Sequence, residues 1–179
     1  VTAASIHDIN AMDNIKYESG SFYIFDRGYL DFERLYFIHQ SKSFFIIRAK
    51  QNLQFKRMYS AAVDKTNGIR CDQTGTLKGY YSHKGYPEVI RRIRFYDKEQ
   101  KRSLVFLTNN LQLAATEIAA LYKHRWKVEL FFKWIKQHLK ITAFWGRSIN
   151  AVKAQVYIAI ITYTLVSIIK QKLNTSYST

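Results

Sequence analysis

A stretch without proline or glycine, from Leu111 to Phe144, constrains the fold more than any other feature of this sequence. Residues that favour helices fill it, so we expect one long helix that begins near Thr116 and continues to about Lys140. Successive residues of a helix are rotated by about 100°, which predicts an apolar face for packing. That face comprises Val128, Phe131, Phe132, Ile135 and Leu139.

A stripe of polar residues lies at the edge of that apolar face. It is formed by Tyr122, Arg125, Glu129 and Lys136, whose spacing confines them to a band only about 60° wide. At a rise of about 1.5 Å per residue, the band extends for roughly 21 Å along the helix. Mixed charges beside an apolar face are also typical of a solvated surface, so the spacing alone leaves both interpretations open.

A further acid follows directly after a short apolar run. Ser21–Phe25 is rich in β-forming residues and predicts a buried strand, which ends at Asp26. Open α/β sheets bind ligands beyond the carboxyl ends of their strands, so Asp26 and the adjacent Arg27 are candidate site residues. An aspartate in this position also serves turns and helix caps, and the residues alone do not separate these roles.

The segments around Asp26 predict an α/β unit. A helix is expected over Asp31–Ser41, capped by Asp31, and a second buried strand over Ser43–Ala49. Strand, helix and strand in this order favour a parallel pair with a right-handed crossover. A later strand is expected over Ser103–Thr108 and a final helix over Ser148–Leu173. The apolar run within that helix is shorter than the roughly 20 residues that span a bilayer, so we expect a buried core helix and no membrane partner.

Residues 51–102 have a different pattern, without helical periodicity. Short β-rich pieces separated by turns predict a small, mainly antiparallel region, with pieces at Gln54–Tyr59, Gly68–Asp72, Gly75–Tyr81 and Val89–Tyr96. Three arginines make the last piece basic, and alternation places Arg92 and Arg94 on one face. Together with other cations they predict a DNA-facing surface: Arg91, Arg48, Lys50, Lys56 and Arg57. The alternative is an exposed strand that its charges protect against edge pairing.

Composition narrows the class of partner. The 179 residues carry 28 Lys and Arg against 13 Asp and Glu, a net charge of +15, and 16% are aromatic. A basic, aromatic-rich domain favours a polyanionic partner, with nucleic acid the leading candidate. Cys71 is the only cysteine, which excludes a disulfide framework within the chain and suits a reducing cytoplasm.

The spaced residues on the long helix resemble a known signature. Tyr122-x2-Arg125-x3-Glu129-x6-Lys136 is similar to the motif of DDE transposases of the insertion-sequence-4 type, and its flanking residues agree as well. Phe25-Asp26-Arg27-Gly28-Tyr29-x2-Phe32 resembles the motif that holds the second acid of the catalytic triad. The resemblance extends over essentially the whole chain.

This resemblance implies roles for individual residues. Asp26 and Glu129 would be catalytic acids that hold Mg²⁺ or Mn²⁺, and Tyr122, Arg125 and Lys136 would contact DNA phosphates. The partners would be double-stranded DNA, at transposon ends and target, and a second copy in a homodimer. The protein would act in the cytoplasm, associated with the nucleoid. Residues expected to add DNA contacts are Arg27, Arg92, Arg94 and Trp145, the last by stacking.

The implied fold is α/β, a ribonuclease-H-like core that is incomplete at the N-terminus. Its expected parts are residues 1–50 of the core, a β-rich insertion over 51–102, and the remainder of the core over 103–179. The first acid of the triad has no match, because Val1–Asp13 resembles the segment that follows the strand carrying it. We therefore expect a fragment of a longer enzyme that is inactive on its own.

Two other functions remain open at this point. Metal-dependent nucleases of the restriction type place an acid and a lysine two residues apart on a strand, whereas Glu129 and Lys136 are seven apart on a predicted helix. A non-catalytic nucleic-acid-binding module explains the arginines, but not the contexts of Asp26 and Glu129.

Overall fold

The computed structural model describes residues 8–138, 146 and 148–173. The chain divides into two compact units, residues 2–125 and residues 126–179, and each is described here by itself. The first unit is built on one six-stranded sheet, and the second contains two helices. The expectation of an α/β chain is confirmed for the first unit, whereas the elements described in the second unit are both helices.

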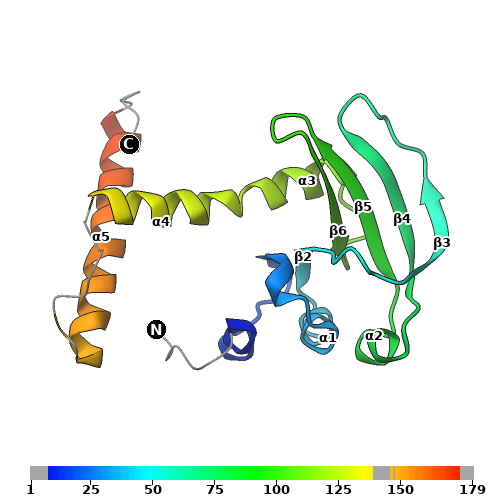
Figure 1. Cartoon of the computed structure of the whole chain (residues 1–179), viewed down its shortest axis with the longest axis horizontal. Helices are drawn as coiled ribbons and strands as arrows, with labels where there is room; N and C mark the ends of the chain where they lie inside the picture. The colour runs from blue at the N-terminus through cyan, green and yellow to red at the C-terminus, as the bar shows by residue number, and fades with distance from the viewer. Residues whose placement is uncertain (1–7, 139–145, 147, 174–179) are drawn as a thin grey trace. The chain divides into compact units, whose positions relative to one another are not determined.

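The sheet of the first unit has the strand order β1-β2-β6-β5-β4-β3 (Figure 1). The strands are β1 (Phe22–Phe25), β2 (Phe44–Arg48), β3 (Phe55–Ala61), β4 (Ile69–Leu77), β5 (Ile90–Asp97) and β6 (Arg102–Thr108). β1 and β2 are parallel, and every other neighbouring pair is antiparallel. The strands predicted over Ser21–Phe25, Ser43–Ala49 and Ser103–Thr108 are therefore confirmed as β1, β2 and β6. The predicted parallel pairing of the first two is confirmed as well.

The helical segments of the first unit connect or cover these strands. They are the 3-10 helices η1 (Asp8–Asn14) and η2 (Arg27–Tyr29) and the α-helices α1 (Phe32–Gln40), α2 (Tyr80–Gly85) and α3 (Ala115–Lys123). The predicted cap of α1 is confirmed, because Asp31 accepts a hydrogen bond of 3.0 Å from the backbone N–H of Arg34. This bond satisfies one of the amides that the first turn of a helix leaves without an intrahelical partner.

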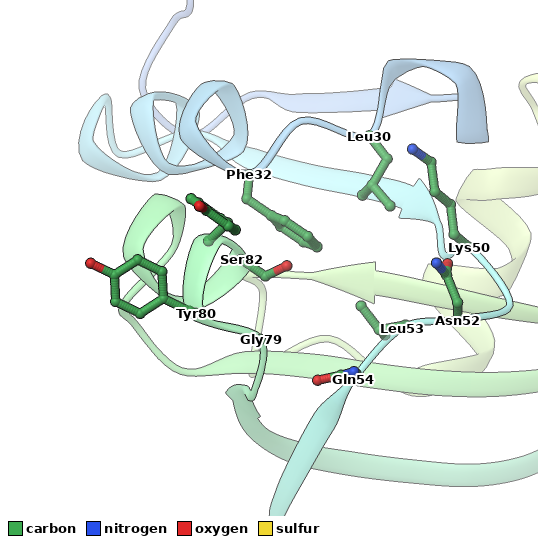
Figure 2. Close-up of a pocket in the computed structure, with 10 residues that line it drawn as sticks. Leu30, Phe32, Lys50, Asn52, Leu53, Gln54, Gly79, Tyr80 and Ser82 are labelled. Carbon is green, nitrogen blue, oxygen red and sulfur yellow. The ribbon is translucent and has the colours of Figure 1, made fainter.

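Two details of the β-rich region differ from the prediction. The pieces expected at Gly68–Asp72 and Gly75–Tyr81 form the single strand β4, and the chain then enters α2, whose Tyr80 and Ser82 are seen in Figure 2. Gly75 is not a turn residue: a Cβ atom there would lie 2.1 Å from the carbonyl oxygen of Lys56. The glycine thus permits a close approach of β3 and β4. All strands of this region belong to the same sheet as β2 and β6.

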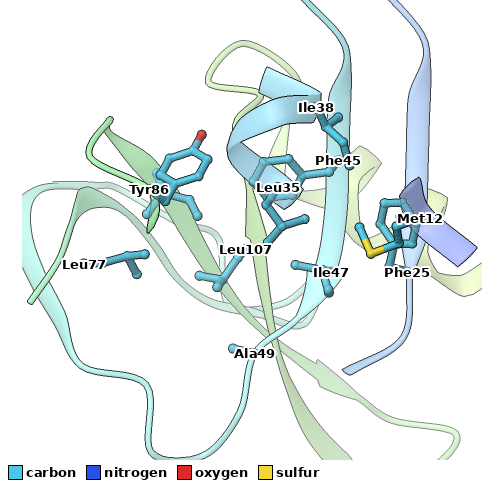
Figure 3. Close-up of a cluster of buried hydrophobic side chains, with 11 residues drawn as sticks. Met12, Phe25, Leu35, Ile38, Phe45, Ile47, Ala49, Leu77, Tyr86 and Leu107 are labelled. Carbon is cyan, nitrogen blue, oxygen red and sulfur yellow. The ribbon is translucent and has the colours of Figure 1, made fainter. Parts of the chain in front are cut away.

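Apolar residues alternate between the two faces of the sheet. On one face, Leu35 and Ile38 of α1 pack with Phe45 and Ile47 of β2 (Figure 3). On the other face, Ile46 packs in a cluster that includes residues of α3. That second cluster also contains Ile69, Ile93, Leu104, Phe106, Ile118, Ala119 and Tyr122. The sheet is therefore covered on both faces, by α1 on one and by α3 on the other.

The expected single long helix is interrupted. α3 ends at Lys123, and α4 (Trp126–His138) begins after a turn at His124 and Arg125 (Figure 1). In this turn the amide of His124 donates to the carbonyl of Leu121 at 3.1 Å, and that of Arg125 to Tyr122 at 3.0 Å. These bonds span three residues and tighten the helix locally. Neither proline nor glycine marks the turn, so no local residue pattern predicts it.

The second unit contains α4 and α5 (Ile149–Leu173). Tyr163 of α5 packs edge-on against Phe131 and Trp134 of α4, at ring-centroid distances of 4.8 and 5.2 Å. The expectation of a buried core helix is wrong, because Ala159 is the one described residue of α5 that is buried. α5 contacts α4 over a small cluster, and much of its apolar surface is exposed. Among the described helices, α5 alone has the length and apolar composition to cross a membrane, a test that core helices of other proteins also pass.

Candidate functional site

Asp26 lies where the sheet brings two parallel strands to the same edge. It follows Phe25, which pairs with Ile47, so Asp26 is level with the end of β2 at Arg48. Asp26 precedes η2, but its side chain accepts no capping bond from that helix. The carboxylate is half-buried and remains available for another partner.

Tyr122 supplies a contact to that carboxylate. Its hydroxyl donates a hydrogen bond of 3.4 Å to Oδ1 of Asp26, across 96 residues of sequence. The ring is 6% exposed and packs on Phe106 of β6, with the centroids 4.6 Å apart. Burial raises the pKa of Tyr122, and the negative charge of Asp26 adds to this, while Arg125 and Arg48 act in the opposite direction. The hydroxyl is therefore protonated at neutral pH and acts as a donor.

A basic pocket is lined in part by Arg27, the residue that follows Asp26 in the chain. It has a volume of about 270 Å³ and is lined by cations from three parts of the chain. These are Arg27, Arg48, Lys50, Arg92 and Arg94. The predicted placement of Arg92 and Arg94 on one face is confirmed, since both line this pocket. Five cations around a small concavity create a positive potential that suits phosphate groups.

The alternative explanation for the arginines, a charged edge strand, is contradicted. β5 is an inner strand that pairs with β4 on one side and β6 on the other. Arg92 lies 4.7 Å above the ring of Phe55 and donates to the side-chain oxygen of Gln73. Arg94 is exposed. Edge protection therefore does not account for their charge.

Arg91 does not belong to this surface, contrary to expectation. It is 7% exposed and points to the other face of β5, where its Nη2 and Nε atoms donate to Asp72 at 2.6 and 2.8 Å. Its Nη1 donates to the carbonyls of Leu113 and Asn110, at 2.6 and 3.3 Å. Arg91 thus fastens the β6–α3 connection to the sheet. Asp72 is the partner that would have indicated this role. It could not be assigned from the sequence, because only the pairing of β4 with β5 brings Asp72 close to Arg91.

The predicted helix residues are divided between the two units. Tyr122 and Arg125 belong to the first unit, where the guanidinium of Arg125 lies 5.8 Å from the centre of the Tyr122 ring. Glu129 and Lys136 belong to the second unit, on α4, with Glu129 in its first turn. Both of these side chains are exposed. Trp145, expected to stack on DNA, lies outside the described residues.

Asp26 is a potential metal ligand, but the structure does not surround it with other ligands among the described residues. No group of three or more His, Cys, Asp and Glu side chains gathers anywhere in the described part of the chain. Asp26 nonetheless offers a carboxylate oxygen, the hard donor that Mg²⁺ and Mn²⁺ prefer. Its placement at a strand end, without a capping bond, fits a ligand that needs further carboxylates to complete a site.

A second cavity adjoins the basic pocket and was missed by the sequence analysis. It measures about 410 Å³ and shares Lys50 and Leu53 with the basic pocket (Figure 2). Tyr80 and Tyr81 lie on its wall and are 75% and 86% exposed. Two adjacent tyrosines, in a segment that begins and ends with glycine at residues 79 and 85, are the sequence feature that could have indicated this cavity.

Comparisons with known proteins identify relatives of this chain. The family described as "Transposase DDE domain" matches residues 1–165. A putative transposase, y4zB, from Sinorhizobium fredii is 37% identical over 173 residues, covering 94% of this chain and 48% of that protein. A probable transposase for insertion sequence element IS5377 from Geobacillus stearothermophilus is 33% identical, covering 78% of this chain and 37% of the relative.

A more distant relative is a putative transposase for insertion sequence element IS4SA from a Synechocystis strain. It is 23% identical over 155 residues, which cover 82% of this chain and 40% of the relative. The chain therefore spans about half or less of the length of these relatives. The family match covers most of the sequence and includes the segments of both predicted acids. The chain belongs to the DDE transposase family.

Proposed function

We propose that this chain is part of the catalytic core of a DNA transposase, which cleaves and transfers DNA strands at transposon ends. The single observation that carries the proposal is the half-buried Asp26 at the end of β1, which accepts a hydrogen bond from Tyr122 and directly precedes Arg27 of the basic pocket. A binding surface alone does not need a carboxylate at this strand end, because that charge would repel phosphate. We also propose that the chain contributes to a ribonuclease-H-like core, with residues 51–102 as an insertion.

Asp26 and Glu129 are the proposed catalytic acids and the ligands of Mg²⁺ or Mn²⁺. Both offer hard oxygen donors, and their segments lie within the matched family region. A bound divalent cation would screen the phosphodiester charge and activate the attacking oxygen. The role of the protein is to hold these carboxylates with a geometry that the cation accepts.

The proposed DNA path follows the cations. Arg27, Arg92 and Arg94 line the basic pocket and would hold backbone phosphates of the bound DNA. Arg125 has a planar fork suited to a bidentate phosphate contact, and Lys136 would act as a point charge. Trp145 is retained as a proposed stacking residue. Five of the ten residues that line the pocket are cations, which favours contact with backbone phosphates.

The proposed partner is double-stranded DNA, both at the transposon ends and at the target. Two copies would act together as a homodimer that pairs the two ends, in the cytoplasm and in association with the nucleoid. We further propose that the 179 residues alone do not cleave DNA, because the resemblance assigns two acids of the family's triad to this sequence, Asp26 and Glu129, and finds no match for the first. Addition of the remaining part of the full-length protein should then be required for cleavage.

Isosteric substitutions of the acids in the full-length protein test this function. Asp26→Asn and Glu129→Gln should each lower Mg²⁺-dependent cleavage of transposon-end DNA by more than about 100-fold, since even outer partners of metal ligands account for 10- to 100-fold. Binding of the same DNA, measured by fluorescence anisotropy in EDTA, should be retained or strengthened, because each change removes a negative charge.

A surface carboxylate provides the matched control. Glu99→Gln removes the same charge at an exposed position, where the nearest described cation is Lys123 at 3.7 Å. This variant should cleave like the unmodified protein. A non-catalytic nucleic-acid-binding module would instead show no metal-dependent cleavage in any variant, and its DNA affinity would respond to Arg92 and Arg94 but not to loss of the acids.

A further inference from the structure

We propose that the second cavity, called the tyrosine cavity, holds an unpaired base of a DNA strand, which stacks on Tyr80 or Tyr81. The inference rests on the proposed function, because it names the form of DNA that the protein would take: a single-stranded or locally opened segment. Its basis is a pair of exposed aromatic side chains in a cavity that adjoins the basic pocket.

Tyr80 and Tyr81 are exposed although α2 packs against the rest of its unit. They are more exposed than any other large hydrophobic side chain that the structure describes. Tyr86, directly after α2, attaches this helix to α1, because it is buried and its hydroxyl is hydrogen-bonded to His39 at 2.8 Å. An aromatic ring that stays in water gains nothing from the hydrophobic effect, so folding does not account for the exposed pair. Exposed apolar patches rimmed by polar groups mark binding sites.

The two tyrosine rings are arranged so that they can accept a flat ligand. Their centroids are 5.3 Å apart and their planes cross at 83°, so the rings meet edge to face and do not stack on each other. Figure 2 shows the Tyr80 ring at the rim, pointing away from the cavity, and the ring of Phe32 and the hydroxyl of Ser82 pointing into it. An aromatic face at the rim and polar groups inside suit a base, which combines a flat π surface with hydrogen-bonding edges.

The lining of the tyrosine cavity matches the chemistry of a base. Its volume of about 410 Å³ falls in the range of about 300–1,000 Å³ that small-molecule sites have. Leu30 and Leu53 supply apolar contacts, and the side chains of Asn52 and Gln54 each carry hydrogen-bond donors and an acceptor. None of the described residues that line the cavity is acidic, so no carboxylate there repels the strand to which the base belongs.

The neighbouring basic pocket offers a place for the phosphates of the same strand. Lys50 and Leu53 line both cavities, so the two sites are contiguous. Arg92 and Arg94 line the basic pocket and carry the charge that a phosphate requires. Aromatic rings beside a cationic groove are the combination by which proteins bind single strands.

An intact duplex cannot use the tyrosine cavity in this way. Paired bases present only their edges in the grooves, since neighbouring base pairs cover their faces. A tyrosine can therefore stack only on a base that is unpaired or has been turned out of the helix. Exposed tyrosines also occur in protein–protein interfaces. The net charge of +15 and the five cations of the adjoining pocket favour a nucleic acid as the ligand.

The test compares the affinities of the full-length protein for single-stranded and duplex DNA, measured by fluorescence anisotropy in EDTA. The ligands are an oligothymidylate of about 16 nucleotides and a duplex of the same length. We expect Tyr80→Ala/Tyr81→Ala to bind the single strand at least about five-fold more weakly, the low end of what a stacking aromatic contributes. Duplex affinity should change by less than about two-fold, because the base faces are covered. Tyr80→Phe/Tyr81→Phe keeps the rings and should bind both ligands like the unmodified protein.

An abasic strand shows whether the tyrosines act on bases. An oligonucleotide of the same length without bases keeps every phosphate, so it should bind the alanine variant and the unmodified protein equally. Tyr59→Ala is the control, because Tyr59 is exposed on β3 and lines neither cavity. This variant should bind the single strand like the unmodified protein, and thermal unfolding checks that every variant is folded.

Unchanged affinity of Tyr80→Ala/Tyr81→Ala for the oligothymidylate would overturn the inference and leave these side chains to a protein partner. An equal loss with the duplex or the abasic strand would overturn it as well, since the rings would then act on the DNA backbone. The proposed function is tested separately by Asp26→Asn and Glu129→Gln. If both variants keep cleavage, the proposed function fails, whatever the tyrosine variants show. If both lose cleavage and the tyrosine variants keep their affinity for the single strand, the base site alone fails.

Discussion

Three arginines within four residues of β5 are expected to respond in opposite ways to the same substitution. Arg91→Met, Arg92→Met and Arg94→Met each remove one positive charge and keep a long apolar stem. Arg91 lies on the buried face of the strand, whereas the other two line the basic pocket. The series therefore separates a role in stability from a role in DNA binding at constant change of charge.

The magnitude for Arg91 follows from its partners. It forms two bonds to Asp72, at 2.6 and 2.8 Å, and Asp72 is itself 9% exposed. Removing one member of a buried ion pair leaves the other charge without compensation and costs about 3–5 kcal/mol. Folded domains are stable by about 5–15 kcal/mol, so the loss is a large fraction of the total. The carbonyls of Leu113 and Asn110 would lose a donor as well.

Smaller effects on stability are expected at the other two positions. Arg92 lies over Phe55 at 4.7 Å, a contact worth about 0.5–1 kcal/mol at a partly exposed site. Arg94 is exposed, and such substitutions usually change stability by no more than about 0.5 kcal/mol. Each of these two variants should instead weaken DNA binding. Loss of one phosphate contact should reduce the slope of log K against log salt by about 0.9.

Urea unfolding and fluorescence anisotropy with duplex DNA at several salt concentrations provide the two measurements. The double variant Arg91→Met/Asp72→Met should recover most of the stability lost in Arg91→Met, because no uncompensated charge remains. The reasoning is refuted if Arg91→Met lowers DNA affinity at unchanged stability. It is also refuted if Arg92→Met and Arg94→Met leave both DNA affinity and its salt dependence unchanged.

Three further predictions concern stability. Gly75→Ala should destabilise the protein by about 1–3 kcal/mol in urea unfolding, because the new Cβ atom would lie 2.1 Å from the Lys56 carbonyl; a neutral effect would contradict the described β3–β4 approach. Asp31→Ala should cost about 1 kcal/mol through loss of the α1 cap, and equal stability would show that the cap contributes nothing. Tyr86→Phe should lose about 1 kcal/mol at neutral pH, since the hydroxyl is hydrogen-bonded to His39 at 2.8 Å. Burial raises the pKa of Tyr86, so the unmodified protein has this contribution below about pH 10 and loses it as the pH rises further; the difference in Tm between the two proteins should shrink there, and a constant difference would exclude this ionisation.

The elements that sequence reasoning located best are those with a bounded apolar run or a local cap. β1, β2 and β6 are short and flanked by polar residues, and Asp31 marks the start of α1 by a contact within three residues. In each case the signal and the structure lie in the same few residues. Local patterns are sufficient for such elements because helix, strand and turn each have a distinct arrangement of apolar and polar residues within a few positions.

Features that depend on distant pairing could not be obtained in this way. Alternation correctly grouped Arg92 with Arg94, but it did not reveal that Arg91 meets Asp72, because that needs the register of β4 and β5. The contact of Tyr122 with Asp26 spans 96 residues and arises only when α3 packs on the sheet. The turn between α3 and α4 carries no helix-breaking residue, so tertiary context must determine it.

The two edges of the sheet have consequences for how the protein behaves at high concentration. Among the described strands, β1 and β3 are the outermost, and each leaves one row of backbone amides and carbonyls without a strand partner. β3 carries Lys56 and Arg57 and an irregularity in its pairing, features that discourage an added strand. β1 reads Phe-Tyr-Ile-Phe and has no charge. Self-association of the 179-residue chain in storage would therefore begin at β1, and a lysine at an outward position of this strand is the change most suited to keeping the chain monodisperse.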